Sequence, residues 1–154
     1  MRFLPLATSL LLLGPATAQF FGPGLSWAGT SGNGTRSFVP TCQNLRVTAV
    51  PGETVTLTIW GDPQAPFALF AATSGSQCLV FPGINNGLVL DFPVETVLFG
   101  VLTQQSPCLA CPPGMEALQI PIPNGLPPGT ALSVQAASIG NRALAFTTAI
   151  TATI

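Results

Sequence analysis

The chain has 154 residues, of which 47 % are hydrophobic and only 6 % are charged, and its formal net charge is −1. It contains no lysine, histidine or tyrosine. It therefore cannot form a polybasic surface for nucleic acid or anionic lipid, and it lacks the usual general bases and activated nucleophiles of enzymes. The composition indicates a non-catalytic protein with a neutral polar surface and without a cofactor.

Residues 1–18 have the pattern of a signal peptide. Met1 and Arg2 form a short basic start, residues 3–14 are uncharged and rich in leucine, and Ala16-Thr17-Ala18 is a small-x-small cleavage site. The apolar run is too short to cross a bilayer core of about 30 Å as a stable helix. We therefore expect a secreted or cell-surface protein with no membrane span after cleavage. The mature chain carries three arginines and five carboxylates.

Residues 19–43 show no sustained period and are rich in glycine, serine and threonine. This composition predicts an extended or partly disordered N-terminal arm. The aromatic residues of the arm either anchor it to the domain or form a contact surface; they are Phe20, Phe21, Trp27 and Phe38.

Residues 44–154 predict one domain of eight or nine short strands. The clearest is 54–60, in which Val55, Leu57 and Ile59 alternate with threonines, as in a half-buried antiparallel strand. Other runs of this kind, bounded by glycine, proline or asparagine, are 45–49, 66–72, 78–81, 88–92, 97–102, 115–122, 131–139 and 142–154. A helix is the main alternative for the last run, but its threonines disfavour one.

These runs predict an all-β fold, namely an antiparallel, Ig-like β-sandwich, with a closed barrel as the alternative. No crossover helix is available to join parallel strands, so we expect none. Pro121 and Pro123 lack the N–H of a central strand, which places that end of their strand at a sheet edge. If the last run, 142–154, also lies at an edge, it can pair with a partner strand, since Arg142 is its only charge.

Four cysteines in an exported protein predict two disulfides, for which three pairings are possible. We favour Cys42–Cys78 together with Cys108–Cys111. The Cys108-x-x-Cys111 spacing is also that of a redox motif, but Pro-Pro-Gly follows and prevents the helix that this chemistry needs. A zinc site needs a second close pair of cysteines, which the chain lacks, so no metal is expected.

The remaining polar and aromatic residues suggest few sites. Asp91 and Glu95 are the closest carboxylates, either solvated at a strand end or, as the alternative, a glycosidase pair or calcium site. Trp27 and Trp60 either cover the core or stack on a sugar ring. We expect a structural or interaction module that contacts another envelope or extracellular protein or copies of itself; the alternative is a carbohydrate-binding module that uses an exposed tryptophan.

The C-terminal half resembles a module found in secreted proteins of planctomycetes and some other bacteria. Matching positions are the segment 120–124 (IPIPN), Gly129, Leu132, Gln135-Ala136 and the closing strand to Ile154. Upstream, Pro51-Gly52, Leu57 and the run 65–70 are similar to earlier strands of that module. The resemblance implies an exported β-sandwich without assigned catalytic residues. The Cys108–Cys111 loop is a departure from the module's pattern.

Overall fold

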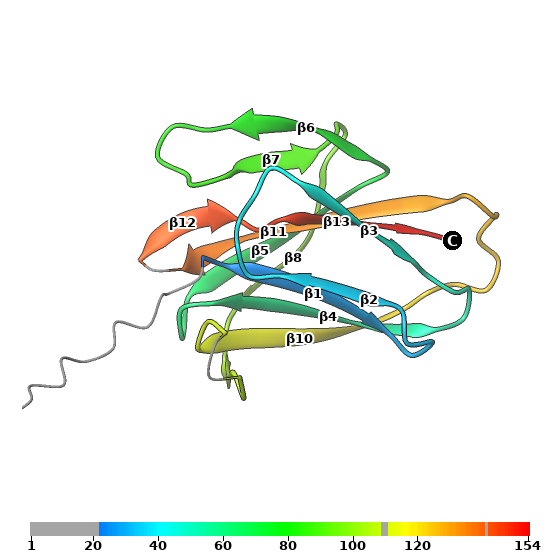
Figure 1. Cartoon of the computed structure of the whole chain (residues 1–154), viewed down its shortest axis with the longest axis horizontal. Helices are drawn as coiled ribbons and strands as arrows, with labels where there is room; N and C mark the ends of the chain where they lie inside the picture. Colours follow the sequence, from blue (N-terminus) through cyan, green and yellow to red (C-terminus); the bar gives the residue numbers. More distant parts are fainter. Residues whose placement is uncertain (1–21, 109–110, 141) are drawn as a thin grey trace, which may run out of the picture.

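The computed structural model describes residues 22–108, 111–140 and 142–154, which form β-strands joined by turns and loops (Figure 1). The predicted signal peptide, residues 1–18, and residues 19–21 of the predicted arm lie outside the described residues. The strands are β1 (Gly24–Gly29), β2 (Gly34–Ser37), β3 (Asn44–Thr48), β4 (Thr54–Gly61), β5 (Pro66–Ala72), β6 (Gly75–Val80), β7 (Gly87–Leu90), β8 (Glu95–Val101), β9 (Gln104–Gln105), β10 (Gly114–Pro121), β11 (Ala131–Gly140), β12 (Ala143–Phe146) and β13 (Ala149–Thr153).

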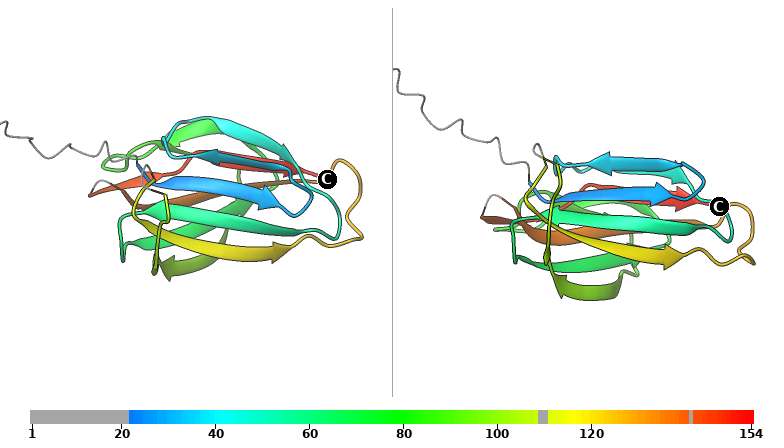
Figure 2. Two further views of the ribbon diagram at one scale, coloured as in Figure 1. Left: turned by 60° about the horizontal axis from the view of Figure 1, so that its bottom comes forward. Right: turned by 90° about the horizontal axis from the view of Figure 1, so that it is seen from below.

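Two sheets pack face to face, which confirms the predicted all-β sandwich (Figures 1 and 2). The first sheet has the order β2-β1-β4-β10-β9. The second has the order β3-β13-β11-β5-β8, and β12 pairs with β11 beside this path. The nine predicted strand regions all contain strands; β1, β2, β9 and the division of the last region into β12 and β13 bring the number to thirteen.

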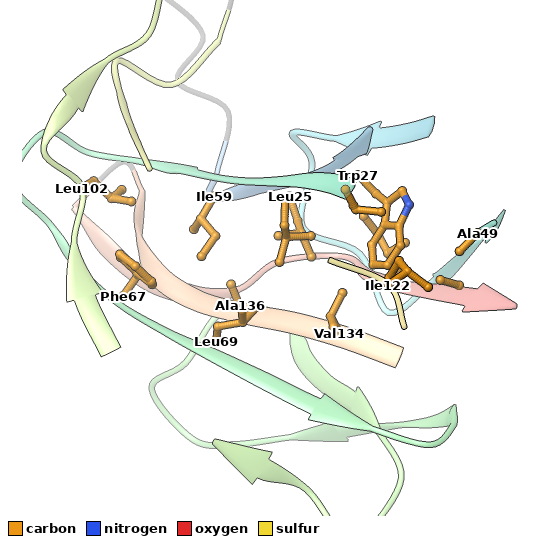
Figure 3. Packing of buried hydrophobic residues seen from close by; sticks show 14 of the residues in the cluster. Leu25, Trp27, Ala49, Ile59, Phe67, Leu69, Leu102, Ile122, Val134 and Ala136 are labelled. Carbon is orange, nitrogen blue, oxygen red and sulfur yellow. The ribbon is translucent and has the colours of Figure 1, made fainter. Parts of the chain in front are cut away.

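The core lies between the two sheets and follows the alternation of the sequence. Val55, Leu57 and Ile59 of β4 are fully buried, as predicted, because strand residues two apart share a face. From the second sheet, Leu69 and Val134 meet them (Figure 3). Leu118 and Ile120 of β10 pack at the margin of this core. At Pro121, β10 pairs with β4 on one side and has no strand on the other, in agreement with the prediction from the missing N–H.

The predicted arm is corrected by the structure over residues 24–37. β1 pairs antiparallel with β4 over six residues and with β2 over four, so both strands belong to the first sheet. Leu25 and Trp27 are in the core, at 0 % and 1 % exposure. The glycine-rich composition concealed these strands because the small residues Gly24, Ser26 and Ala28 lie on the outer face of β1, where no long side chain is needed to fill a core.

The prediction of one continuous final strand was wrong, since β12 and β13 divide this region, and the condition under which it could pair with a partner strand, an edge position, is not met by β13. β13 lies between β11 and β3, so its backbone is paired on both sides. The pairing with β3 is parallel, with Ile150 opposite Leu45, which also corrects the expectation of purely antiparallel sheets. No crossover helix joins β3 to β13, because the strands from β4 to β12 lie between them in the chain and form the connection.

A hairpin of β6 and β7 forms a third layer over the outer face of the second sheet (Figure 1). Leu88, Val89 and Leu90 of β7 pack there in a second cluster with Phe146 and Ala149. The fully buried Gln135 of β11 joins the layers by hydrogen bonds. Its Oε1 accepts from the Val89 N–H at 2.8 Å, and its Nε2 donates to the Gly87 and Thr147 carbonyls at 2.9 and 2.7 Å.

Replacing Gln135 by leucine is expected to lower the free energy of unfolding by about 2 to 3 kcal/mol, because three buried backbone groups lose their partner. Urea denaturation of the purified protein measures this loss. The matched control is Gln119→Leu, since Gln119 is exposed and its Nε2 donates to the Thr56 hydroxyl at the surface. The control is expected to change stability by less than about 0.5 kcal/mol, and equal losses in the two variants would contradict the assigned role of Gln135.

Candidate interaction site

The two tryptophans proposed for ligand stacking have different environments. Trp27 is only 1 % exposed and lies in the core, so it cannot form a stacking platform (Figure 3). It faces inward because β1 pairs with β4 in the register that places Trp27 opposite Leu57. The prediction of Trp27 as a ligand-stacking residue was therefore wrong, and its alternative, an anchor for the N-terminal segment, is the one that the structure shows.

Trp60 is half-buried on the outer face of the first sheet, the face that its threonine neighbours share. Phe38 contacts it edge-on, with ring centroids 5.3 Å apart, and the Arg36 guanidinium lies 5.9 Å from the Phe38 ring centroid. Beside Trp60 is a shallow hollow of ≈ 370 Å³. Small and polar residues of β1 and β2 line the rest of it, namely Ser26, Ala28, Gly34, Thr35 and Arg36, with Trp27 contributing from beneath.

The four cysteines form the favoured pairs, Cys42–Cys78 and Cys108–Cys111, with Cα–Cα distances of 5.5 and 5.2 Å. The first bond ties β6 of the third layer to the segment that leads into β3. The second closes the loop between β9 and β10, and a strand follows it rather than a helix. The environment that lowers the pKa of a redox cysteine at a helix N-terminus is therefore missing from this loop.

The carboxylates that accept the most hydrogen bonds are held in the ionised form. The Ser74 hydroxyl lowers the pKa of Asp91, burial opposes this shift, and donors from Ser76 at 3.0 to 3.1 Å reinforce it. The Val50 N–H, at 2.7 Å, lowers the pKa of Glu53, and Ser31 reinforces the shift against burial. Glu53 thus stabilises the fold above its unfolded-state pKa, and this contribution is lost as the pH falls.

A general acid needs a raised pKa, and neither Asp91 nor Glu53 has one. Among residues 22–108, 111–140 and 142–154, no three side chains of histidine, cysteine, aspartate or glutamate gather as metal ligands do. Within the same ranges there is no helix with the length and hydropathy needed to cross a bilayer.

An exposed apolar surface lies on β8, the outermost strand of the second sheet, which pairs with β5 alone (Figure 2). Its aliphatic and aromatic side chains are exposed to an unusual degree: Val97 by 55 %, Leu98 by 38 %, Phe99 by 74 % and Val101 by 43 %. Phe92, in the turn before β8, is 74 % exposed as well. Contiguous exposed apolar residues of this kind mark contact surfaces in soluble proteins.

The free backbone groups of β8 can be assigned from the end of its ladder with β5. The Leu102 N–H donates to the Ala65 carbonyl at 3.0 Å, and the Leu102 carbonyl accepts from the Gln64 N–H at 3.1 Å. In an antiparallel ladder, successive residues point their backbone groups to opposite sides. The N–H and carbonyl groups of Phe99 and Val101 therefore point away from β5, toward the open edge.

The other outermost strands of the two main sheets are protected against further pairing, whereas β8 has only a register shift in its pairing with β5, between Leu69 and Phe70. Edge strands are normally short or carry charges or prolines that discourage pairing with another chain. β2 is four residues long and contains Arg36, β3 contains Arg46, and β9 has two residues. The open side of β10 ends at Pro121. β8 is seven residues long, contains no proline, and has one charge, Glu95, at its first position.

Strand 97–102 was predicted from the sequence, but its edge position was not. An unbroken apolar run is typical of a buried strand as well as of an unprotected edge, and periodicity does not distinguish them. No family model, curated protein or solved structure matches the chain. The resemblance to the secreted planctomycete module accordingly stays a prediction.

Proposed function

We propose that the protein is an exported, non-catalytic interaction module that binds another polypeptide by strand addition at β8. One observation carries this proposal: a seven-residue edge strand with exposed apolar side chains and outward-facing backbone groups. Backbone hydrogen bonds supply affinity in strand addition, and alternate side chains supply specificity. A partner strand next to β8 forms hydrogen bonds with the backbone N–H and carbonyl groups of Phe99 and Val101 and covers their side chains.

The place of action that we propose is the cell surface or the extracellular space. The two disulfides are compatible with an oxidising compartment, and residues 1–18 have the sequence pattern of an export signal. The partner is then another envelope or extracellular protein, or a second copy of the chain. The absence of lysine, histidine and tyrosine from the sequence supports a binding role over a catalytic one.

Carbohydrate binding is the second candidate, and the hollow beside Trp60 is the observation in its favour. A half-exposed indole next to serine, threonine and arginine side chains provides both stacking and hydrogen bonding. However, Phe38 packs edge-on against Trp60, and the buried Trp27 cannot supply a second ring. With Trp60 as its single stacking residue, the hollow is poorly equipped to bind a sugar. Carbohydrate binding is therefore a weaker candidate than strand addition at β8.

The strand-addition proposal is tested with a displayed library of random peptides selected on the immobilised secreted protein. Selected peptides are expected to be extended sequences with alternating apolar residues, and their binding is expected to protect the Phe99 and Val101 amides from hydrogen exchange. Affinity is expected to fall at least about tenfold in Phe99→Lys, which places a charge on the edge, and in Val101→Pro, which removes an outward N–H.

The matched control is Val80→Lys, because Val80 is 73 % exposed on β6, away from the β8 edge. It is expected to bind the selected peptides as the unmodified protein does. Peptides that bind Phe99→Lys and Val101→Pro with unchanged affinity contradict the proposal. Binding of a soluble glycan that is lost in Trp60→Ala, with no peptide selected, supports the carbohydrate alternative instead.

A further inference from the structure

We infer that Asn124 is a site of spontaneous covalent modification, at which the side-chain amide is lost through a cyclic imide and an acidic residue takes its place. Asn124 and Gly125 lie in a turn of the loop that joins β10 to β11 at one end of the sandwich (Figure 1). The site is independent of strand addition at β8. The chain contains two further Asn-Gly pairs, and the structure distinguishes them from this one.

The reaction takes place between two neighbouring residues. The backbone nitrogen of Gly125 attacks Cγ of Asn124, an N–C bond forms, the attacking nitrogen loses its proton to water, and the side-chain nitrogen leaves as ammonia. Water then opens the cyclic imide at either of its carbonyl groups and leaves aspartate or isoaspartate at position 124. Water is the only other reactant, and nothing is oxidised or reduced. Glycine favours ring closure, because it has no Cβ to shield its nitrogen or to restrict the backbone.

The structure leaves Asn124 and Gly125 free to react. Both residues are exposed, and in the part of the chain that the structure describes no hydrogen bond holds the Asn124 side chain or the Gly125 N–H. The Asn124 oxygen lies against Gly52, while no acceptor holds the nitrogen that must leave. The space beside Gly125 is open, since a Cβ there would have no atom within 4 Å apart from its neighbours in the chain.

The ends of this loop are fixed. The Ile122 N–H donates to the Glu53 carbonyl, and the Gly129 N–H donates to the Ile154 carbonyl, each at 2.8 Å. The change at Asn124 is therefore confined to the loop, and the sandwich stays folded. It adds one negative charge to a chain whose formal net charge is −1. Because few charges keep copies of this protein apart, modified copies repel each other more strongly.

The pair Asn86-Gly87 is protected by its contacts. The Asn86 Nδ2, which would have to leave, donates to three carbonyls at 3.1, 3.0 and 3.2 Å, those of Thr41, Phe146 and Thr147. Gly87 is buried at the start of β7. Loss of this amide therefore requires the hydrogen bonds between three segments of the chain to break first.

The pair Asn33-Gly34 is exposed, but its backbone is held in the β1–β2 hairpin. The Asn33 carbonyl accepts from the Gly29 N–H at 2.7 Å, and Gly34 lies opposite Ala28 in the ladder. The peptide group between Asn33 and Gly34 cannot turn toward the side chain unless this end of the ladder opens. Asn33 is therefore intermediate between Asn124 and Asn86.

Incubation of the folded secreted protein in mildly alkaline buffer, followed by mass spectrometry, tests the inference. After denaturation and reduction, a protease that cleaves after glutamate places the three Asn-Gly pairs in different peptides, since at least one glutamate lies between each pair and the next. Conversion of the amide to an acid is expected first at Asn124. Its rate is expected to exceed that at Asn86 by at least about tenfold, because Asn86 must first lose its hydrogen bonds.

The protein in denaturant is the reference. There the three pairs are expected to react at similar rates, because the contacts that distinguish them are gone. Gly125→Ala is the matched variant: its methyl group shields the attacking nitrogen and slows the reaction in the folded protein, and open space receives the methyl group without loss of stability. Asn33 or Asn86 reacting as fast as Asn124 in the folded protein overturns the inference. So does an Asn124 that stays unmodified in the folded protein while the denatured chain reacts.

Discussion

Replacement of Trp27 by alanine is expected to destabilise the protein by about 4 kcal/mol. The side chain is 1 % exposed and packs between the sheets with Leu25 and Ile122 in the same core cluster (Figure 3). Removing a buried indole loses its transfer free energy and leaves a cavity that the surrounding strands fill only in part. Denaturant titration followed by far-ultraviolet circular dichroism measures the loss.

Trp60→Ala is the matched control for Trp27→Ala. Trp60 lies on the outer face of the same sheet, and its principal contact is the Phe38 ring at 5.3 Å. Loss of an edge-on aromatic contact of this kind costs about 1 kcal/mol beyond the area that it buries. The loss in Trp60→Ala is therefore expected to be well below that in Trp27→Ala. Equal losses would contradict the different roles that we assign to the two tryptophans.

Removal of the Cys42–Cys78 disulfide, by replacing both residues with alanine, is expected to lower the free energy of unfolding by about 3.8 kcal/mol on the loop-entropy model. The bond spans a sequence separation of 36, so its loss returns considerable freedom to the unfolded chain. It also links β6 to the segment before β3. Denaturant titration measures the global loss, and hydrogen exchange is expected to show faster opening of the β6–β7 hairpin than of β4.

The control is the double replacement of Cys108 and Cys111, which are three positions apart. The same model gives a loss of about 1.9 kcal/mol for so short a loop, and the exchange of the β6–β7 hairpin is expected to stay unchanged. A larger loss from this pair than from Cys42 and Cys78 would show that the loop-entropy argument does not govern stability here.

The sequence was sufficient to predict which side of a strand is buried. In β4, alternation of β-branched residues separates the core side chains of Val55, Leu57 and Ile59 from the outer threonines, and this information is local. The disulfide pairs were predictable because four cysteines allow only three pairings, of which the structure has the favoured one. Pro121 marked a free edge correctly because its missing N–H is a property of the residue itself.

The order of the strands could not be predicted in the same way. Whether Trp27 is buried depends on the pairing of β1 with β4, whose residues lie about thirty positions further along the chain. Whether β8 or β13 lies at an edge depends on which strands occupy the positions beside them. Both strands are apolar and uncharged over most of their length, so the two runs look alike until their neighbours are known.

The parallel pairing of β3 with β13 has a consequence for the order of folding. Residues 44–48 acquire their neighbour in the second sheet only when residues 149–153 are present, more than a hundred positions later. During synthesis or export, β3 emerges early and must wait for the final strand, whereas β1, β2 and β4 can already pair. Contacts of such high sequence separation slow folding, since a long loop must close before the contact forms. The first sheet is thus able to assemble in the order of the chain, while the second is completed from its last segment.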